Sequence, residues 1–285
     1  MHLFELVPNL SEGRNDAIID DAVDAVEATG ARVIDRSSDA AHHRSVLTIV
    51  GDATTLLEAA LALARVARER IDLRRHSGLH PRIGALDVLP FVPLYDTPMT
   101  EAVALARKAA KAIWEREGIP SFLYGEAALI PERRLLANAR RDGFEGLAGR
   151  FARNDRPDLG DIAAHPSAGA IAVGAREILV AWNIELESND LAAGKAIAAE
   201  LRERNGGLPG IRALAFRLDD GRVQLSFNIT RYRATSPLQL RRSAEAAAAK
   251  RGIALGNGEL IGLLPRAALD DAIAEFFLLD DDGMR

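Results

Sequence analysis

The order of strand-like and helix-like segments constrains this chain of 285 residues most strongly, because the same order occurs twice. In the first half, runs typical of buried or half-buried strands occur at residues 2–7, 32–36, 45–50 and 86–92. Helical spacing of apolar residues lies between them, first after Ser11 as the expected N-cap and again up to about Asp72. A helix at 99–117 and a strand at 121–124 are expected to follow.

The second half of the chain repeats this order. Strands are expected at 178–186, 211–218, 223–229 and within 253–261, and helices at 190–204 and 237–250. A turn at Asp219-Asp220-Gly221 joins the middle two strands as a hairpin, and a last helix begins after Pro265. Two successive β-α-β-β-α-β units predict an α+β fold of two ferredoxin-like subdomains, each a mostly antiparallel sheet with helices on one face.

The division into two units predicts a boundary near residue 176. We expect residues 1–176 and 177–285 to form the N-terminal and C-terminal subdomains. Residues 143–168, before that boundary, are rich in Gly, Pro, Arg and Asp and show little periodicity. A segment of that length is either a disordered linker or a functional loop, and the sequence leaves both interpretations open.

Composition excludes several classes of function. The net charge is -5 and only 14 residues are aromatic, so the chain lacks the positive charge and the stacking surface typical of nucleic-acid-binding proteins. No apolar run approaches the roughly 18 residues of a membrane helix, and we expect no signal peptide. Because the chain has no cysteine, disulfides, thiol catalysis and Cys-bound metal are excluded. We therefore expect a soluble cytoplasmic protein that binds neither nucleic acid nor membrane.

One loop concentrates positive charge in this acidic chain. Residues 74–82 contain three Arg and two His but no acid, and Gly78 and Pro81 interrupt helical continuation. Arginine binds carboxylates with two parallel hydrogen bonds and histidine moves protons near neutral pH, so the loop suits a small anionic substrate. A charged surface loop without a function explains the same residues. Zinc binding by His76 and His80 is not expected, because their i,i+4 spacing aligns two ligands only on a helix.

Two other polar clusters and a pair of glycines are weaker candidates for a site. His43 and Arg44 stand directly before a predicted strand, where they either face solvent or reach the same cleft as the loop. Residues 9–14 surround the predicted start of the first helix, whose backbone N–H groups attract anions. Gly169 and Gly174 permit a close approach between the backbone and a flat ligand. The sequence contains no nucleotide-binding glycine motif, phosphate loop or nucleophile elbow.

Six strings, spread over nearly the whole chain, match the pattern of one protein family. They are VPNLSEGR at 7–14, IDLRRHSGLHPRIGALDV at 71–88, LYGEAA at 123–128, GAIAVGAR at 169–176, WNI at 182–184 and GLLP at 262–265. The run His-Pro-Arg-Ile-Gly-Ala-Leu-Asp-Val, which begins at residue 80, is long and specific. Through these strings the chain resembles the glutamate formiminotransferase (glutamate formimidoyltransferase) family over essentially its whole length.

The resemblance implies a fold, a reaction and partners. It implies two α/β subdomains with a folate cleft between them, and a homodimer. The implied reaction moves the formimino group from N-formimino-L-glutamate to N5 of the co-substrate tetrahydrofolate, a step of histidine degradation, and needs no metal. In some animals this transferase is fused to a cyclodeaminase. Since the chain ends at Arg285, we expect the transferase without that domain.

The resemblance also implies roles for individual residues. The family's catalytic histidine precedes Pro-Arg-x-Gly-Ala-Leu, and this position is His80 here. An imidazole there would take the proton from N5 and return one to the leaving nitrogen of glutamate. The candidates for binding substrate carboxylates are Arg44, Arg75 and Arg82. The folate-binding stretch corresponds to Gly160, Asp161, Ile162, Ala163, Ala164, His165, Pro166, Ser167, Ala168 and Gly169.

Three residues depart from the family pattern, and two alternative functions stay open. His43 stands where Asn is common before Arg, Ala168 where an aromatic residue is common, and Arg231 where many relatives have an acid. These changes leave His80 intact but bear on the fit of the donor. One alternative is a 5-formyltetrahydrofolate–glutamate N-formyltransferase, which uses the same two ligands. The other is a folate-binding protein without catalysis.

Overall fold

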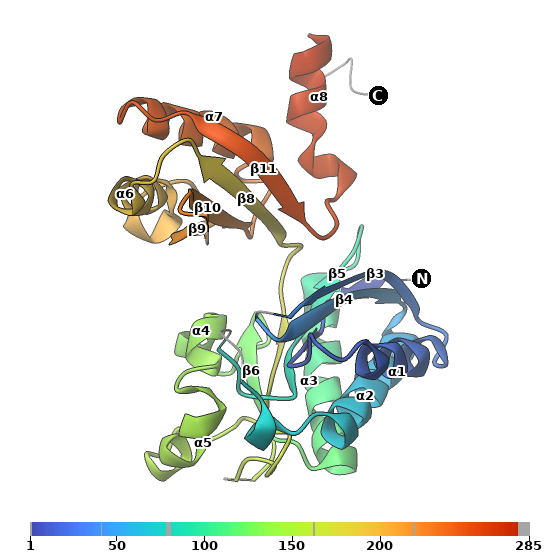
Figure 1. The fold of residues 1–285 in the computed structure, drawn as a ribbon. Helices are drawn as coiled ribbons and strands as arrows, with labels where there is room; N and C mark the ends of the chain where they lie inside the picture. Colours follow the sequence, from blue (N-terminus) through green and yellow to red (C-terminus); the bar gives the residue numbers. More distant parts are fainter. Residues whose placement is uncertain (1, 41, 78–80, 162, 219, 279–285) are drawn as a thin grey trace. The chain divides into compact units, whose positions relative to one another are not determined.

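Two compact units make up the computed structural model of the chain (Figure 1). The first unit contains Met1–Arg176 and the second contains Glu177–Arg285, and each has its own β-sheet and hydrophobic core. The structure describes residues 2–40, 42–77, 81–161, 163–218 and 220–278.

The first unit begins with the expected β-α-β-β-α-β order. Its strands are β1 (Phe4–Leu6) and β2 (Asn9–Leu10), which together form the first strand of the motif, then β3 (Arg32–Asp39), β4 (Arg44–Gly51) and β5 (Leu86–Pro93). Its first helices are α1 (Asp16–Glu27) and α2 (Ala53–Arg70). In the sheet, β1 and β2 lie between β4 and β5, and β3 pairs with the outer edge of β4. All these pairs are antiparallel, and Glu5 of β1 lies opposite Val50 and Val92.

One helix and two parallel strands extend this sheet beyond the motif. α3 (Met99–Glu117) leads to β6 (Ser121–Gly125), and β7 (Ile171–Ala175) lies between β5 and β6, parallel to both. All five residues of β7 are buried, as is typical of a parallel strand covered on both faces. Because such a strand shows no alternation of apolar and polar residues, the sequence pattern does not predict β7.

Helices cover both faces of this sheet, as Figure 1 shows. α1, α2 and α3 pack against one face through the larger core of the unit, which includes Leu6, Ile49 and Leu63. α4 (Leu136–Ala139) and α5 (Gly143–Ala152) contribute to a second apolar cluster with Phe122 and Tyr124 of β6. The sequence predicts a linker or loop from residue 143 onwards, whereas its first ten residues form α5.

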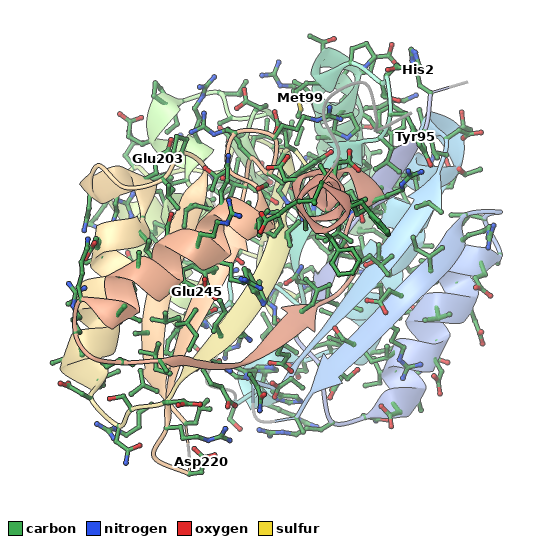
Figure 2. The ribbon with its side chains drawn as sticks, turned by 90° about the horizontal axis from the view of Figure 1, so that it is seen from above. His2, Tyr95, Met99, Glu203, Asp220 and Glu245 are labelled. Carbon is green, nitrogen blue, oxygen red and sulfur yellow. The ribbon has the colours of Figure 1, made fainter. Side chains whose placement is uncertain are left out.

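The second unit is a complete β-α-β-β-α-β motif. Its elements are β8 (Val180–Leu186), α6 (Leu191–Leu201), β9 (Ile211–Arg217), β10 (Val223–Ile229), α7 (Pro237–Ala249) and β11 (Leu255–Ile261), followed by α8 (Asp270–Phe277). The sheet has the order β11-β8-β10-β9 and every pair in it is antiparallel. Alternate residues of these strands, such as Leu225 and Phe227, face a core that includes Leu240 of α7. Asp220 lies at the tip of the β9–β10 hairpin (Figure 2).

Both units confirm the α+β class and the doubled β-α-β-β-α-β order. Short 3₁₀ helices complete the described elements: η1 (Leu73–Arg75), η2 (Pro131–Arg134), η3 (Glu203–Asn205) and η4 (Arg266–Ala268). Within the part of the chain that the structure describes, no helix combines the length and the apolar content needed to cross a membrane.

The start of α1 differs from the sequence expectation. Asn15, rather than Ser11, is the N-cap of this helix, and its side chain accepts the N–H of Ala17. Ser11 instead donates from Oγ to the carbonyl oxygen of Gly84 at 2.7 Å. The Ser11 hydroxyl, which the local sequence pattern predicts to cap the helix, therefore makes a tertiary contact instead.

Candidate active site

One end of the first sheet brings together several of the segments that the sequence marks for function. Two hydrogen bonds join the chain after β2 to the residues that follow the basic loop. The Ser11 hydroxyl donates to the carbonyl oxygen of Gly84, and the Ser11 N–H donates to the carbonyl oxygen of Ala85 at 2.8 Å. Ser45, at the start of β4, donates from Oγ to the carbonyl oxygen of Glu12 at 2.6 Å. The N-terminal segment, the start of β4 and the loop before β5 thus form one cluster.

The predicted folate-binding stretch lies against the same loop. Leu73, which precedes the loop, donates its N–H to the carbonyl oxygen of Ser167 at 2.9 Å. Ala85, which follows the loop, donates to the carbonyl oxygen of Ala168, also at 2.9 Å. The fold therefore places these two segments side by side, although the bonded residues are 94 and 83 positions apart in the sequence.

Within the stretch itself, exposure differs from residue to residue. Ala168 and Gly169 are buried, whereas Ala164, His165 and Ser167 are half-buried and Gly160, Asp161, Ala163 and Pro166 are exposed. Ile162 lies outside the described residues. The ring Nδ1 of His165 accepts the N–H of Ala168 at 3.1 Å, so its hydrogen is on Nε2. Burial lowers the pKa of His165, and the nearby charges of Arg68 and Arg74 act in the same direction.

The two glycines that the sequence offers for ligand contact serve contacts within the chain. Gly169 has a φ of +72°, and a Cβ at this position would lie 2.1 Å from the carbonyl oxygen of Ile83. At Gly174 a Cβ would lie 2.5 Å from the ring of Tyr124. Glycine is required at both positions because neighbouring parts of the protein approach the backbone closely.

Glu12 supplies a buried carboxylate at the centre of the cluster. One of its oxygens, Oε1, accepts the backbone N–H groups of Gly13, Arg14 and Asn15 at 2.9, 2.8 and 3.0 Å. Burial alone raises the pKa of Glu12, but these N–H groups and His43 outweigh it and hold the pKa below its usual value. The N–H groups before α1, which the sequence offers to a substrate anion, are therefore occupied by a side chain of the protein.

Two histidines stack beside this carboxylate. Nε2 of His43 lies 3.0 Å from Oε1 of Glu12, and Nδ1 lies 3.1 Å from the carbonyl oxygen of Ser77. The rings of His43 and His76 are nearly parallel, with centroids 4.2 Å apart and an angle of 6° between their planes. Nε2 of His76 lies 3.2 Å from the carbonyl oxygen of His43. His43 has a φ of +52°, a region in which Asn, Asp and His are enriched.

Arg44, at the start of β4, is buried and paired inside the protein. Its Nε donates to Oδ1 of Asn9 at 2.8 Å and its Nη2 to Oδ2 of Asp87 at 3.1 Å. The fully buried Asp87 also accepts the N–H of Ile83, and Nη1 of Arg140 lies 3.5 Å from it. Burial lowers the pKa of Arg44, an effect that Asp87 opposes and Arg140 reinforces. Two guanidinium groups around one carboxylate leave an excess of positive charge at this point.

Arg82 lies at the end of the basic loop and is half-buried, with 11% of its side chain exposed. Its Nη2 donates to Oε1 of Glu145 at 2.8 Å and to the carbonyl oxygen of His76 at 3.2 Å. Its Nε and the Nδ1 of His76 are buried and make no hydrogen bond to the described part of the chain. An unmet buried donor or acceptor costs about 1–3 kcal/mol, so both atoms are suited to meet a ligand or water.

Three further residues that the sequence marks are Arg75, Arg231 and His80. Arg75 is 89% exposed in its side chain and is 4.0 Å from Asp72. Arg231 follows β10 in the second unit and forms an ion pair with Glu203 of η3, which is labelled in Figure 2. His80, the predicted catalytic residue, lies outside the described residues.

Sequence reasoning did not assign a role to the acidic partners in this cluster. Asp87 had a recognisable signal, because it is a single charge within the apolar run of β5. Glu145 had none, since it belongs to a helix that the periodicity does not predict. In the described ranges, no group of three or more His, Asp or Glu side chains gathers in a way that could hold a metal ion.

Comparison with known proteins gives the family of the chain. The model of the formiminotransferase domain, N-terminal subdomain, matches residues 3–176, and the model of the formiminotransferase domain matches residues 181–284. This chain belongs to the formiminotransferase family. The resemblance seen in the sequence strings is thereby confirmed, and the family places the chain among the transferases.

Relatives of this formiminotransferase-family chain include two prokaryotic proteins of similar length. Those named glutamate formimidoyltransferase from Streptococcus pyogenes serotype M1 and Thermoplasma acidophilum are each 40% identical over 283 residues. These alignments cover 98% of this chain, 94% of the first relative and 93% of the second. The protein named formimidoyltransferase-cyclodeaminase from Rattus norvegicus is 35% identical over 98% of this chain, which corresponds to 54% of that relative.

Proposed function

We propose that this chain is a glutamate formimidoyltransferase, which moves the formimino group from N-formimino-L-glutamate to N5 of tetrahydrofolate. The observation that carries the proposal is the 40% identity with proteins of that name over 98% of the chain. The cluster of Arg44, Arg82 and Arg140 around the loop before β5 supports it, because the donor and folate are both carboxylates. The reaction would belong to histidine degradation.

The proposed reaction needs one proton transfer between two nitrogens. N5 of tetrahydrofolate attacks the amidine carbon of the donor, and the new C–N bond gives a tetrahedral intermediate. The bond from that carbon to the nitrogen of glutamate then breaks, and glutamate leaves as an amine. We assign to His80 the transfer of the N5 proton to this leaving nitrogen, a role that contributes about 10²–10⁴-fold in rate. Its sequence neighbours Ser77 and Arg82 belong to the cluster described above.

The surroundings of the three candidate arginines suggest different tasks in substrate binding. Arg82 has a buried Nε without a partner in the described ranges, which supports a direct hydrogen bond to a substrate carboxylate. Arg44 already binds Asp87 and Asn9. We therefore propose that it contributes positive potential that attracts the substrate carboxylate, rather than a direct bidentate contact with it. The exposed side chain of Arg75 suits a carboxylate that reaches solvent, such as the folate tail.

We further propose that residues 160–169 contact folate and that the first unit contains the catalytic histidine. The bonds of Ser167 and Ala168 to both flanks of the basic loop support this, because they bring the stretch to the cluster. The family resemblance supports a homodimer in the cytoplasm, with no nucleic acid or membrane as partner.

The decisive experiment is an assay of the purified chain with both candidate donors. We expect transfer when N-formimino-L-glutamate and tetrahydrofolate are supplied, and none between 5-formyltetrahydrofolate and glutamate, with the folate products identified by mass spectrometry. His80→Ala should lower kcat by about 10²–10⁴-fold while folate still binds. His42→Ala is the matched control, because His42 is 52% exposed in its side chain and bonds to Asp39.

Three other outcomes would contradict the proposal. Formyl transfer alone would identify the chain as an N-formyltransferase. Folate binding without turnover of either donor would indicate a protein that has lost catalysis. Unimpaired turnover in His80→Ala would remove the assignment of the catalytic histidine.

A further inference from the structure

The ring of His43 lies between two groups that can only accept a hydrogen bond. Its Nε2 is 3.0 Å from the carboxylate oxygen of Glu12, and its Nδ1 is 3.1 Å from the carbonyl oxygen of Ser77. The N–H groups that surround Glu12 keep its carboxyl ionised, so this oxygen has no hydrogen to give. Both contacts are hydrogen bonds only if both ring nitrogens of His43 bear a hydrogen, and that species is the imidazolium cation.

The pair of Glu12 and His43 is largely removed from water. Only 11% of the Glu12 side chain and 13% of the His43 side chain are exposed. A buried carboxylate is costly without a cation, and a charge-assisted hydrogen bond is about twice as strong as a neutral one. Burial by itself disfavours a charge on the ring, so the carboxylate of Glu12 is the group that favours the charged form of His43.

His76 differs from His43 in the hydrogen bonds that its ring makes. Its Nε2 faces the carbonyl oxygen of His43 at 3.2 Å and must donate, while its buried Nδ1 meets no donor in the described ranges. Burial lowers the pKa of His76, and the positive charges of His43 and Arg82 act in the same direction. In the stacked pair, His76 is therefore the neutral ring and His43 the charged one. Among the described residues, the charged groups beside the pair are Glu12 and Arg82, and Arg82 is in turn bound to Glu145.

We propose that His43 is a charged positioning residue of this active site. As an imidazolium it bridges the carboxylate of Glu12 and the carbonyl of Ser77, and so fixes the stacked His76 and the backbone at the start of the basic loop. Loss of one ring hydrogen leaves a lone pair facing an oxygen, which breaks one of the two bonds. Turnover should therefore fall when His43 loses this ring hydrogen. The link to turnover rests on the proposed formimidoyl transfer, whereas the charge of His43 does not.

The first test determines the charge of His43 without any need for activity. Imidazole ¹⁵N spectra of the full chain at neutral pH should show hydrogens on both ring nitrogens of His43 and on Nε2 alone of His76, with His43→Asn used to assign the signals. A neutral His43 at neutral pH would overturn the proposal. This result is independent of whether the chain transfers a formimino group.

The second test compares the pH dependence of kcat/KM between His43→Asn and the unchanged chain. Asn tolerates a positive φ and donates one neutral hydrogen bond, so the variant should fold but lose one charge-assisted contact. We expect about a 10- to 100-fold lower kcat/KM at neutral pH and the disappearance of the fall in kcat/KM that accompanies loss of the His43 ring hydrogen. His42→Asn, with equal loss of one imidazole outside the cluster, should keep the profile of the unchanged chain. Identical profiles for His43→Asn and the unchanged chain would overturn the proposal.

Discussion

Of the three arginines marked by the sequence for substrate carboxylates, Arg75 is exposed, Arg82 is half-buried and Arg44 is buried. Arg75 projects into solvent, whereas Arg44 and Arg82 are enclosed and bound to acidic partners. Residue type alone does not separate these cases. A guanidinium group can face solvent, form an ion pair inside the protein or bind a substrate, depending on its neighbours. At the scale of the residue, function depends on the partners that folding supplies.

Glu12→Gln tests the most heavily bonded of those partners. The amide keeps an acceptor for the N–H groups of Gly13, Arg14 and Asn15 but loses the charge, so we expect a loss of about 1–2 kcal/mol in the free energy of unfolding at pH 7. Because folding lowers the pKa of Glu12, this stabilisation is complete above its usual value of 4.5 and is lost as pH falls through the lower folded-state value.

Urea unfolding of both proteins from pH 7 down to pH 3 measures this difference. The gap in stability between Glu12→Gln and the unchanged chain should narrow on the acidic side. Glu27→Gln, an exposed acid at the end of α1, is the control and should change stability by less than about 0.5 kcal/mol. A gap that is constant over this pH range would contradict the role given to the charge.

At the scale of the element, α5 is held on the sheet by a group of ion pairs. Asp155, just after the helix, accepts hydrogen bonds from Arg150, Arg133 and Arg141 at 2.6, 2.7 and 2.8 Å. The buried guanidinium of Arg150 also lies 4.0 Å from the ring centroid of Phe122 on β6. Glu145, which binds Arg82, belongs to α5. The ion pairs of Asp155 that hold α5 in place therefore also help to position Arg82.

Asp155→Asn should loosen α5 while leaving the rest of the first unit folded. Removal of one partner from a buried ion pair leaves an uncompensated charge, and we expect a loss of roughly 3 kcal/mol. Amide hydrogen exchange should accelerate in α5 but not in α1. The control is Asp142→Asn, which removes an exposed pair with Arg153 at the start of the same helix and should have little effect. Equal acceleration of amide exchange in Asp155→Asn and Asp142→Asn would contradict the proposed role of Asp155 in holding α5.

At the scale of the whole molecule, the larger core of the first unit and the core of the second unit share none of the described residues. Leu63 of α2 is fully buried in the first core and Leu240 of α7 is fully buried in the second. Each Leu→Ala substitution should cost about 2–5 kcal/mol in the unit that contains it. Amide exchange should rise mainly in β8–β11 for Leu240→Ala and mainly in α2 and α3 for Leu63→Ala. A uniform rise over both units in either variant would show that they unfold as one.

Most secondary structure was predictable because periodicity and turn residues are local signals. The helix at Met99–Glu117 and the β9–β10 hairpin lie where the pattern indicates them. β7 and α5 were not predictable, since an apolar parallel strand lacks alternation and α5 lies in a segment rich in Gly and Arg. Both depend on packing against β5 and β6, which a local pattern does not contain.

The sequence by itself determined the fold class, the doubled motif and, through its family strings, the formiminotransferase family. It also marked the basic loop and Arg44. Only the tertiary structure decided how the cluster is connected: Glu12 with His43, Arg44 with Asp87 and Arg82 with Glu145 are 31, 43 and 63 positions apart. Spacing along the chain cannot encode such pairs, because they form only when separate strands and loops meet at one end of the sheet.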